Sequence, residues 1–80
     1  MSEYEYILQV GRENIDILNK ITEAYEGIGN VRTLDSNKGI IKILTISYFL
    51  DDIDNMLDKI RKIYNIDIKL ISKEEWQGVI

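Results

Sequence analysis

The chain has 80 residues, a formal net charge of -4, and neither Cys nor His. A chain of this length forms one domain with a small core, and without thiols or imidazoles it lacks disulfides, the commonest metal ligands and the usual catalytic bases. The negative charge disfavours nucleic acid as a partner. No apolar run is long enough to span a membrane, and the acidic start does not resemble a signal peptide. We therefore expect a cytoplasmic protein without cofactor or metal, which binds neither nucleic acid nor membranes.

The first predicted elements are a strand and an amphipathic helix. Residues 4–10 alternate between apolar and polar side chains, which is the pattern of a half-buried strand. After Gly11, a helix ending near Glu26 is predicted by apolar residues at three- and four-residue spacing, namely Ile17, Leu18, Ile21, Ala24, Tyr25 and Ile28. Gly27 is expected just past the end of this helix, where the chain turns through positive φ.

A β-hairpin is predicted next. Residues 30–35 alternate weakly, residues 36–39 have the composition of a turn that ends in Gly39, and residues 40–46 are rich in β-branched side chains. In the second strand both faces are largely apolar, although Lys42 interrupts one of them. Such a strand is expected in the centre of a sheet.

The second half of the chain predicts another helix and a strand. After a connector over residues 47–50, Asp51 is expected to cap a helix whose apolar stripe is Ile53, Met56, Leu57, Ile60, Ile63 and Tyr64. Residues 66–71 then alternate as a strand. The motif Ser72-Lys73-Glu74-Glu75 fits a capping box and predicts a short terminal helix that places Trp76 against an apolar surface.

This order predicts an α+β fold of the ferredoxin-like βαββαβ type. Short connections pack both helices on one face of a four-stranded antiparallel sheet with the expected strand order 4-1-3-2. Residues 1–80 form one domain, with a core over about residues 4–71 and a tail over residues 72–80.

Two stretches carry a resemblance to a known family. The run from Asp16 to Ala24, followed by Gly27-Ile28-Gly29-Asn30-Val31, resembles the first helix and second strand of ACT domains, regulatory modules that often bind amino acids where two copies meet. Tyr25-Glu26-Gly27, with Val31-Arg32-Thr33-Leu34-Asp35 and Gly39, resembles a family of short, uncharacterised bacterial proteins with an ACT-like fold. The resemblance covers residues 6–56 and implies the fold rather than an activity.

The candidate site residues are Arg32, Glu26, Thr33, Asp35 and Asp16. Ligand-binding ACT domains have Gly at the position of Asp16, so a carboxylate here would repel an anionic ligand, and an ordinary first-turn carboxylate is the simpler interpretation. Arg32 binds a carboxylate or phosphate, with Thr33 or Glu26 assisting, or else it solvates an edge strand. Asp35 either belongs to this site or forms an Asx turn, and Glu26 is expected to pair with Arg32.

The face of the sheet away from the helices would carry Ile7 and apolar residues of 40–46, which favours an interface. We expect a homodimer through this face or through an edge strand, unless Trp76, Val79 and Ile80 cover the face and leave a monomer. The leading function is a non-enzymatic, ACT-like module that self-associates and binds a small anionic ligand or a protein partner. The alternative is a purely structural adaptor subunit without a ligand.

Overall fold

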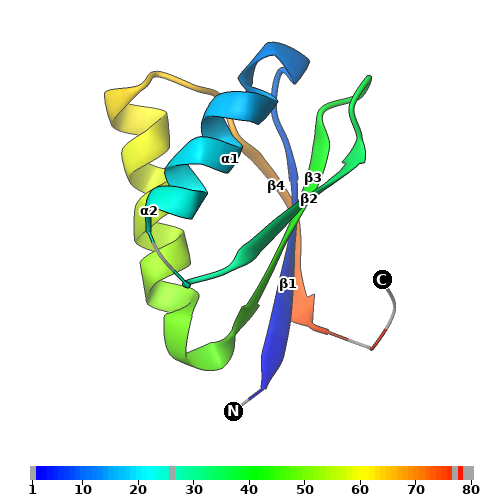
Figure 1. Cartoon of the computed structure of the whole chain (residues 1–80), viewed down its shortest axis with the longest axis vertical. Coiled ribbons are helices and arrows are strands. Elements are labelled where there is room, and N and C mark those ends of the chain that lie inside the picture. The colour runs from blue at the N-terminus through cyan, green and yellow to red at the C-terminus, as the bar shows by residue number, and fades with distance from the viewer. Residues whose placement is uncertain (1, 26, 77, 79–80) are drawn as a thin grey trace.

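The computed structural model describes residues 2–25, 27–76 and 78, and it places two helices on one face of a four-stranded antiparallel sheet (Figure 1). The strands are β1 (Glu3–Gln9), β2 (Asn30–Asp35), β3 (Ile40–Ile46) and β4 (Lys69–Glu75). The helices are α1 (Ile15–Ala24) and α2 (Leu50–Ile63), each preceded by a single 3-10 turn. The strand order β2-β3-β1-β4 confirms the predicted order and is consistent with a ferredoxin-like fold.

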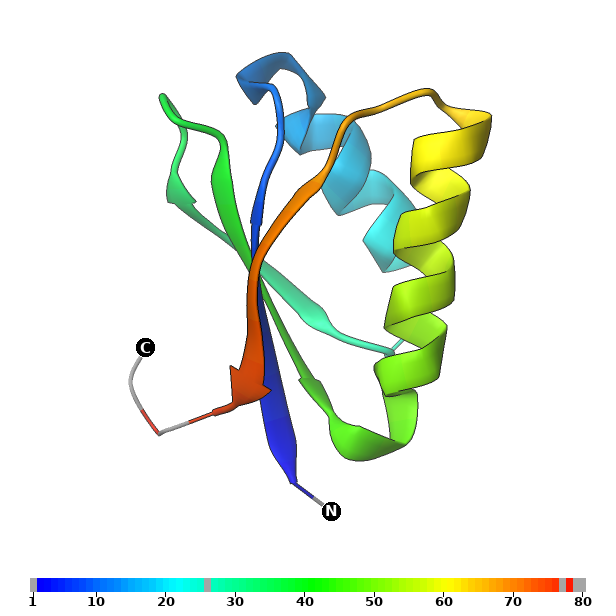
Figure 2. The ribbon, with the colours of Figure 1, turned by 180° about the vertical axis from the view of Figure 1, so that it is seen from behind.

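The core lies between the sheet and the helices. The view from behind shows both helices on one face of the sheet (Figure 2). Alternate residues of β1 and β3 face the helices, so Tyr6, Leu8, Ile41 and Ile43 have no exposed surface. Helix residues meet them at three- and four-residue spacing. The buried apolar set is Tyr6, Leu8, Val10, Ile15, Leu18, Ile28, Ile41, Ile43, Ile53, Met56, Leu57, Ile60, Ile66 and Ile68.

The positive φ predicted for Gly27 is confirmed, and Gly39 also has positive φ. The predicted end of the first helix near Glu26 is wrong, because α1 ends at Ala24 and Gly27 lies three residues beyond it. Gly27 has φ 78° after α1, and Gly39 has φ 69° at the end of the β2–β3 turn. In that turn the Asp35 carboxylate accepts a hydrogen bond from the Lys38 amide at 3.1 Å, so Asp35 stabilises the turn as its Asx-type interpretation predicts, although the bond reaches three residues along the chain rather than two. The Val10 amide donates to the Gly39 carbonyl at 2.9 Å, so the turn is fastened to the end of β1.

Two details predicted for α2 are wrong. The helix begins at Leu50, so Asp51 lies in the first turn, and the cap position is taken by Phe49 without a side-chain hydrogen bond. The buried stripe ends at Ile60, because Ile63 and Tyr64 are 71% and 50% exposed. In the connector after the helix, Ile66 and Ile68 are buried instead.

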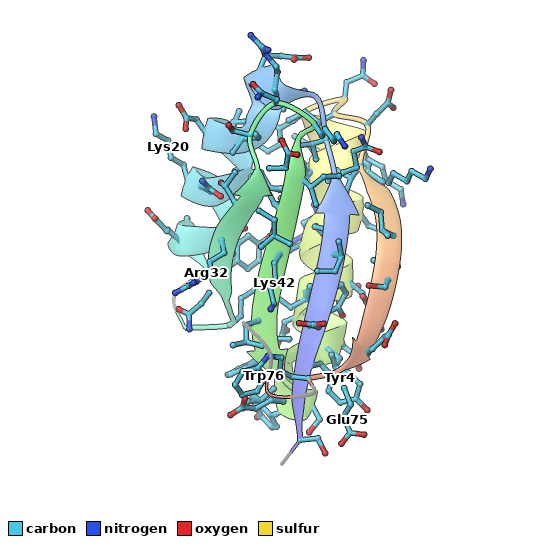
Figure 3. The ribbon with its side chains drawn as sticks, turned by 90° about the vertical axis from the view of Figure 1, so that its right-hand side faces the viewer. Tyr4, Lys20, Arg32, Lys42, Glu75 and Trp76 are labelled. Carbon is cyan, nitrogen blue, oxygen red and sulfur yellow. The ribbon has the colours of Figure 1, made fainter. Side chains whose placement is uncertain are left out.

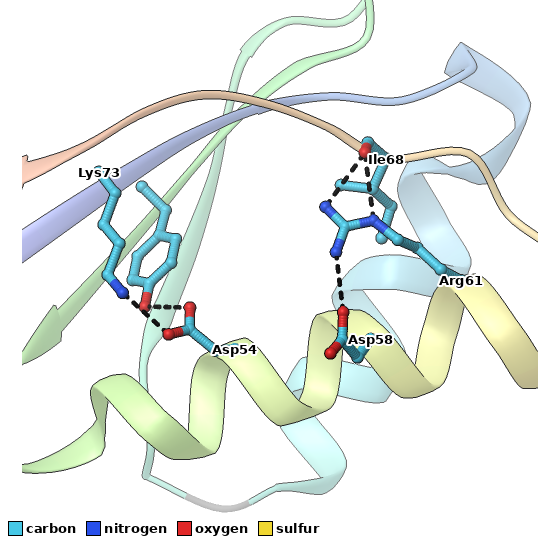
Figure 4. Close-up of polar contacts among 6 residues, drawn as sticks. Asp54, Asp58, Arg61, Ile68 and Lys73 are labelled. Atoms are coloured by element: carbon cyan, nitrogen blue, oxygen red, sulfur yellow. Dashed lines mark hydrogen bonds and ion pairs between the residues drawn. The ribbon is translucent and has the colours of Figure 1, made fainter.

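The predicted strand over residues 66–71 is also wrong in its position. The connector containing Ile68 is extended but unpaired, and the Arg61 guanidinium holds it by donating to the Ile68 carbonyl at 3.1 and 3.3 Å (Figure 4). β4 starts at Lys69 and continues through Glu75, so the predicted terminal helix and the tail from residue 72 are replaced by strand. The exposed edge of β1 offers backbone partners along this whole stretch, and that pairing outweighs the local capping-box preference.

Within the described part of the chain, no helix has the length and apolar character needed to cross a membrane.

Candidate functional site

The face of the sheet turned away from the helices, called the outer face below, carries the charged residues of interest. The strand register aligns Arg32 of β2, Lys42 of β3, Ile7 of β1 and Ser72 of β4 in one row. Because the neighbours of Lys42 in β3 point into the core, this row points outward (Figure 3). The expected position of Ile7 on this face is thus confirmed.

Lys42 is unusual because it is buried although it does not face the core. Its side chain is 8% exposed, and its Nζ lies 2.9 Å from Glu5 Oε2, whose side chain is 23% exposed. An ion pair on a bare sheet surface would keep most of its contact with water. Removing it from water costs free energy that its attraction only partly returns, so the outer face must be locally covered.

Trp76 contributes to that cover. Its backbone amide donates to the Glu3 carbonyl at 2.8 Å, which fixes the chain directly after β4. The half-buried indole lines a pocket of about 250 Å³ together with Asn30, Arg32, Lys42 and Leu44. We call this the outer-face pocket; Figure 3 shows Trp76 and Lys42 on the same side of the sheet. Val79 and Ile80, which were also expected to cover this face, lie outside the described residues.

Arg32 lies at the rim of the outer-face pocket. Its side chain is exposed and, among residues 2–25, 27–76 and 78, it has no hydrogen-bond or ion-pair partner. Glu26, its expected partner, lies outside the described residues. Among the described residues, the ionised side chains that line this pocket are the cations Arg32 and Lys42, on a chain of net charge -4, and Glu5 lies against Lys42.

The other predicted site residues are not brought to Arg32. Asp16 is exposed in the first turn of α1, in agreement with its simpler interpretation. Thr33 shares a second hollow with it, of about 630 Å³, between the start of α1 and the β2–β3 turn. Asp35 is engaged in the turn with Lys38. The predicted cluster is therefore divided between two faces of the sheet, because Arg32 and Thr33 are adjacent in a strand.

A second polar cluster joins α2 to the sheet and was not predicted from the sequence. The Tyr6 hydroxyl donates to Asp54 Oδ1 at 2.8 Å, and Lys73 Nζ lies 2.8 Å from Asp54 Oδ2 (Figure 4). Burial, followed by the hydrogen bond and charge of Asp54, raises the pKa of Tyr6 above its ordinary value, so its hydroxyl stays protonated. The sequence offered one signal for this cluster: Tyr6 belongs to the inward-facing stripe of its strand, and a buried tyrosine hydroxyl needs a hydrogen-bond partner.

The fold and the outer-face pocket define a small α+β domain with a cation-bearing sheet face that is partly covered by the residue following β4. A family model of a domain of unknown function, DUF4911, matches residues 8–63. The chain therefore belongs to the DUF4911 family. The matched region includes Arg32 and Lys42 but neither Glu5 nor Trp76. No curated protein and no solved structure matches the chain.

Proposed function

We propose that this chain is a non-enzymatic, ACT-like module that binds a small anionic ligand in the outer-face pocket and that self-associates. The observation that carries the proposal is Arg32, an exposed guanidinium without a partner among the described residues, at the rim of a pocket lined also by the buried Lys42. Glu5 offsets one of these two charges. The Arg32 guanidinium is left for a ligand.

The surroundings of Arg32 favour an anion over water. A guanidinium presents two parallel N–H donors to a carboxylate or a phosphate, and such bidentate pairs are stronger than neutral hydrogen bonds. The pocket walls formed by Leu44 and Trp76 lower the local dielectric, which strengthens the attraction between charges. The long-range repulsion expected from the net charge of -4 is opposed locally by the two cations.

Removing Arg32 tests the ligand proposal. We expect phosphate, acetate or another small anion to raise the Tm of the wild type in a concentration-dependent way, because a ligand that binds only the folded state stabilises it. Arg32→Ala should abolish the rise. Arg12→Ala is the matched control, since Arg12 is equally an exposed arginine but lines the second hollow. Equal Tm shifts in all three proteins, measured by differential scanning fluorimetry, would reduce the effect to non-specific screening.

The chemistry of the side chains supports a non-enzymatic role. The chain has no Cys or His to act as nucleophile or base near neutral pH. Tyr6, which is hydrogen-bonded to Asp54, keeps its proton because its pKa is raised, so it is a poor nucleophile. A binding function needs none of these groups.

Self-association is best accommodated at β4, an edge strand of the sheet. Leu70 and Ile71 are 44% and 48% exposed there, and the outer face is already partly occupied by Trp76. β4 begins with Lys69 and ends with Glu75. Two copies of β4 paired antiparallel about a two-fold axis would therefore place the basic end of each strand beside the acidic end of the other.

Charge introduced on the β4 edge tests this arrangement. We expect the wild type to sediment as a dimer at micromolar concentration and Ile71→Lys to sediment as a monomer, because an exposed lysine opposes pairing of the edge. Leu34→Lys is the control, since Leu34 is 49% exposed on β2 at the opposite edge. A monomeric wild type rules out self-association. A dimer that shows no anion response through Arg32 favours the alternative, a structural adaptor.

A further inference from the structure

We infer that the ligand of the outer-face pocket is a small carboxylate that carries a flat apolar group and no ammonium group. This inference rests on the proposed function and names the class of ligand. Arg32 binds the carboxylate, and the apolar group lies against the Trp76 indole and Leu44. The inference depends on the composition of the walls, on the placement of charge, and on the size of the pocket.

The composition of the walls is divided between polar and apolar side chains. Arg32, Asn30 and Lys42 bring polar groups, whereas Leu44 and Trp76 bring an aliphatic chain and an indole. A bare phosphate or sulfate would use only the polar part. An aromatic ring stacked on the indole would remove apolar surface from water in addition, and it would gain a favourable ring-to-ring geometry.

The placement of charge excludes an ammonium group. Both ionised side chains that line the pocket are cations, and no carboxylate lines it among the described residues. Glu5, a carboxylate on the same outer face, already lies 2.9 Å from Lys42 Nζ. The ammonium group of an amino acid would lose water without gaining an anionic partner, and it would be repelled by Arg32. This is the opposite of the preference for amino acids that the ACT resemblance implies.

The size of the pocket limits the ligand to one ring with a short chain. Its volume is about 250 Å³. Pockets for drug-sized ligands begin at about 300 Å³. A dinucleotide or an acyl chain would therefore extend into solvent. The pocket can recognise only a single ring and a single carboxylate of its ligand.

Three probes separate the parts of this inference. Hydrocinnamate has the ring and the carboxylate, free phenylalanine adds one ammonium group, and acetate lacks the ring. Trp76 is the only tryptophan in the chain, so its fluorescence reports on the pocket directly. We expect hydrocinnamate to change this fluorescence with a Kd at least about tenfold lower than that of phenylalanine or acetate, and a tenfold change corresponds to about 1.4 kcal/mol. Phenylalanine would bury an unpaired ammonium group, whereas acetate would bury no ring against the indole.

Variants of the two key residues complete the test. Arg32→Ala should weaken hydrocinnamate binding at least about tenfold, whereas the control Arg12→Ala should leave it unchanged. Trp76→Phe keeps an aromatic wall and should retain the preference for hydrocinnamate over acetate. Trp76→Ala should lose that preference, with Tm shifts as the readout in both variants and circular dichroism as the check of folding.

Each outcome bears on one claim. Equal binding of phenylalanine and hydrocinnamate would overturn the exclusion of an ammonium group. Equal binding of acetate and hydrocinnamate, still dependent on Arg32, would overturn the apolar part and leave the proposed function intact. If Arg32→Ala weakens the binding of none of the anions, the proposed function itself fails together with this inference.

Discussion

Replacing Gly39 by Ala is expected to unfold the protein far more readily than replacing Gly27 by Ala, although both glycines have positive φ. A Cβ on Gly39 would be driven into the carbonyl of Val10, which is backbone and cannot rotate away. A Cβ on Gly27 would meet no described atom within 4 Å. Comparing the two variants therefore separates two contributions to the loss of stability, the strain of positive φ and the steric clash of the new Cβ with the Val10 carbonyl.

The expected magnitudes follow from these two contributions. Gly27→Ala should lower the free energy of unfolding by about 1 kcal/mol, the cost of placing a Cβ in the left-handed region. Gly39→Ala should lower it by more than about 3 kcal/mol, because the turn must also move away from β1 and lose the bond between the Val10 amide and the Gly39 carbonyl. Urea unfolding followed by circular dichroism measures both. Equal losses would show that the backbone relaxes around the new methyl group.

Removing the carboxylate of Glu5 is the second change with a large expected effect. Glu5→Ala leaves the Lys42 ammonium in a place where its side chain is only 8% exposed, without the carboxylate that lies 2.9 Å from it. We expect a loss of roughly 2 to 3 kcal/mol in the free energy of unfolding, below the full cost for a completely buried pair because Glu5 is partly solvated. The double variant Glu5→Leu with Lys42→Met should recover most of this loss, since it removes both charges and keeps apolar volume.

A carboxylate in the same row of the sheet provides the control for this experiment. Glu74 lies opposite Glu5 in the pairing of β1 with β4 and is exposed. Glu74→Ala should change the free energy of unfolding by less than about 0.5 kcal/mol, as is usual for an exposed charge. If Glu5→Ala is equally mild in the same urea titrations, the outer face is wetter than its burial indicates, and the low-dielectric argument for the pocket fails with it.

The parts of the fold that were predicted correctly are those where local pattern and tertiary role agree. Both strands of the hairpin, residues 30–35 and 40–46, were predicted to the residue because turn chemistry separates two runs of extended residues. The strand order followed from the sequence of elements and from the apolar character of both faces of β3. Gly27 and Gly39 were predictable because few other residues accept positive φ.

The error at β4 has a physical cause. Ile66 and Ile68 alternate with polar residues because any extended segment that crosses the end of a core buries every second side chain. Alternation cannot reveal whether backbone partners are present. Those partners begin only where the chain reaches the edge of β1, at Lys69, and they continue through residues that in isolation favour a helix start.

The candidate site was predicted in part. Arg32 was identified as a single exposed cation, but Thr33 and Asp16 lie in another hollow, since adjacent strand residues point to opposite faces. Lys42 was noted only as an interruption of an apolar face. The burial of Lys42 depends on the ion pair with Glu5 and on the cover from Trp76, and both residues are distant from Lys42 in the sequence.

The pairing of β1 with β4 has a consequence for synthesis on the ribosome. β1 is made first, yet Tyr4 pairs with Glu75, near the other end of the chain. Until that residue has left the exit tunnel, one edge of β1 presents unpaired backbone groups to its surroundings. A nascent chain in which β4 is still inside the tunnel also lacks the outer-face pocket, because Trp76, which lines the pocket, follows β4. The ligand binding proposed above would therefore require a chain in which β4 is already paired with β1.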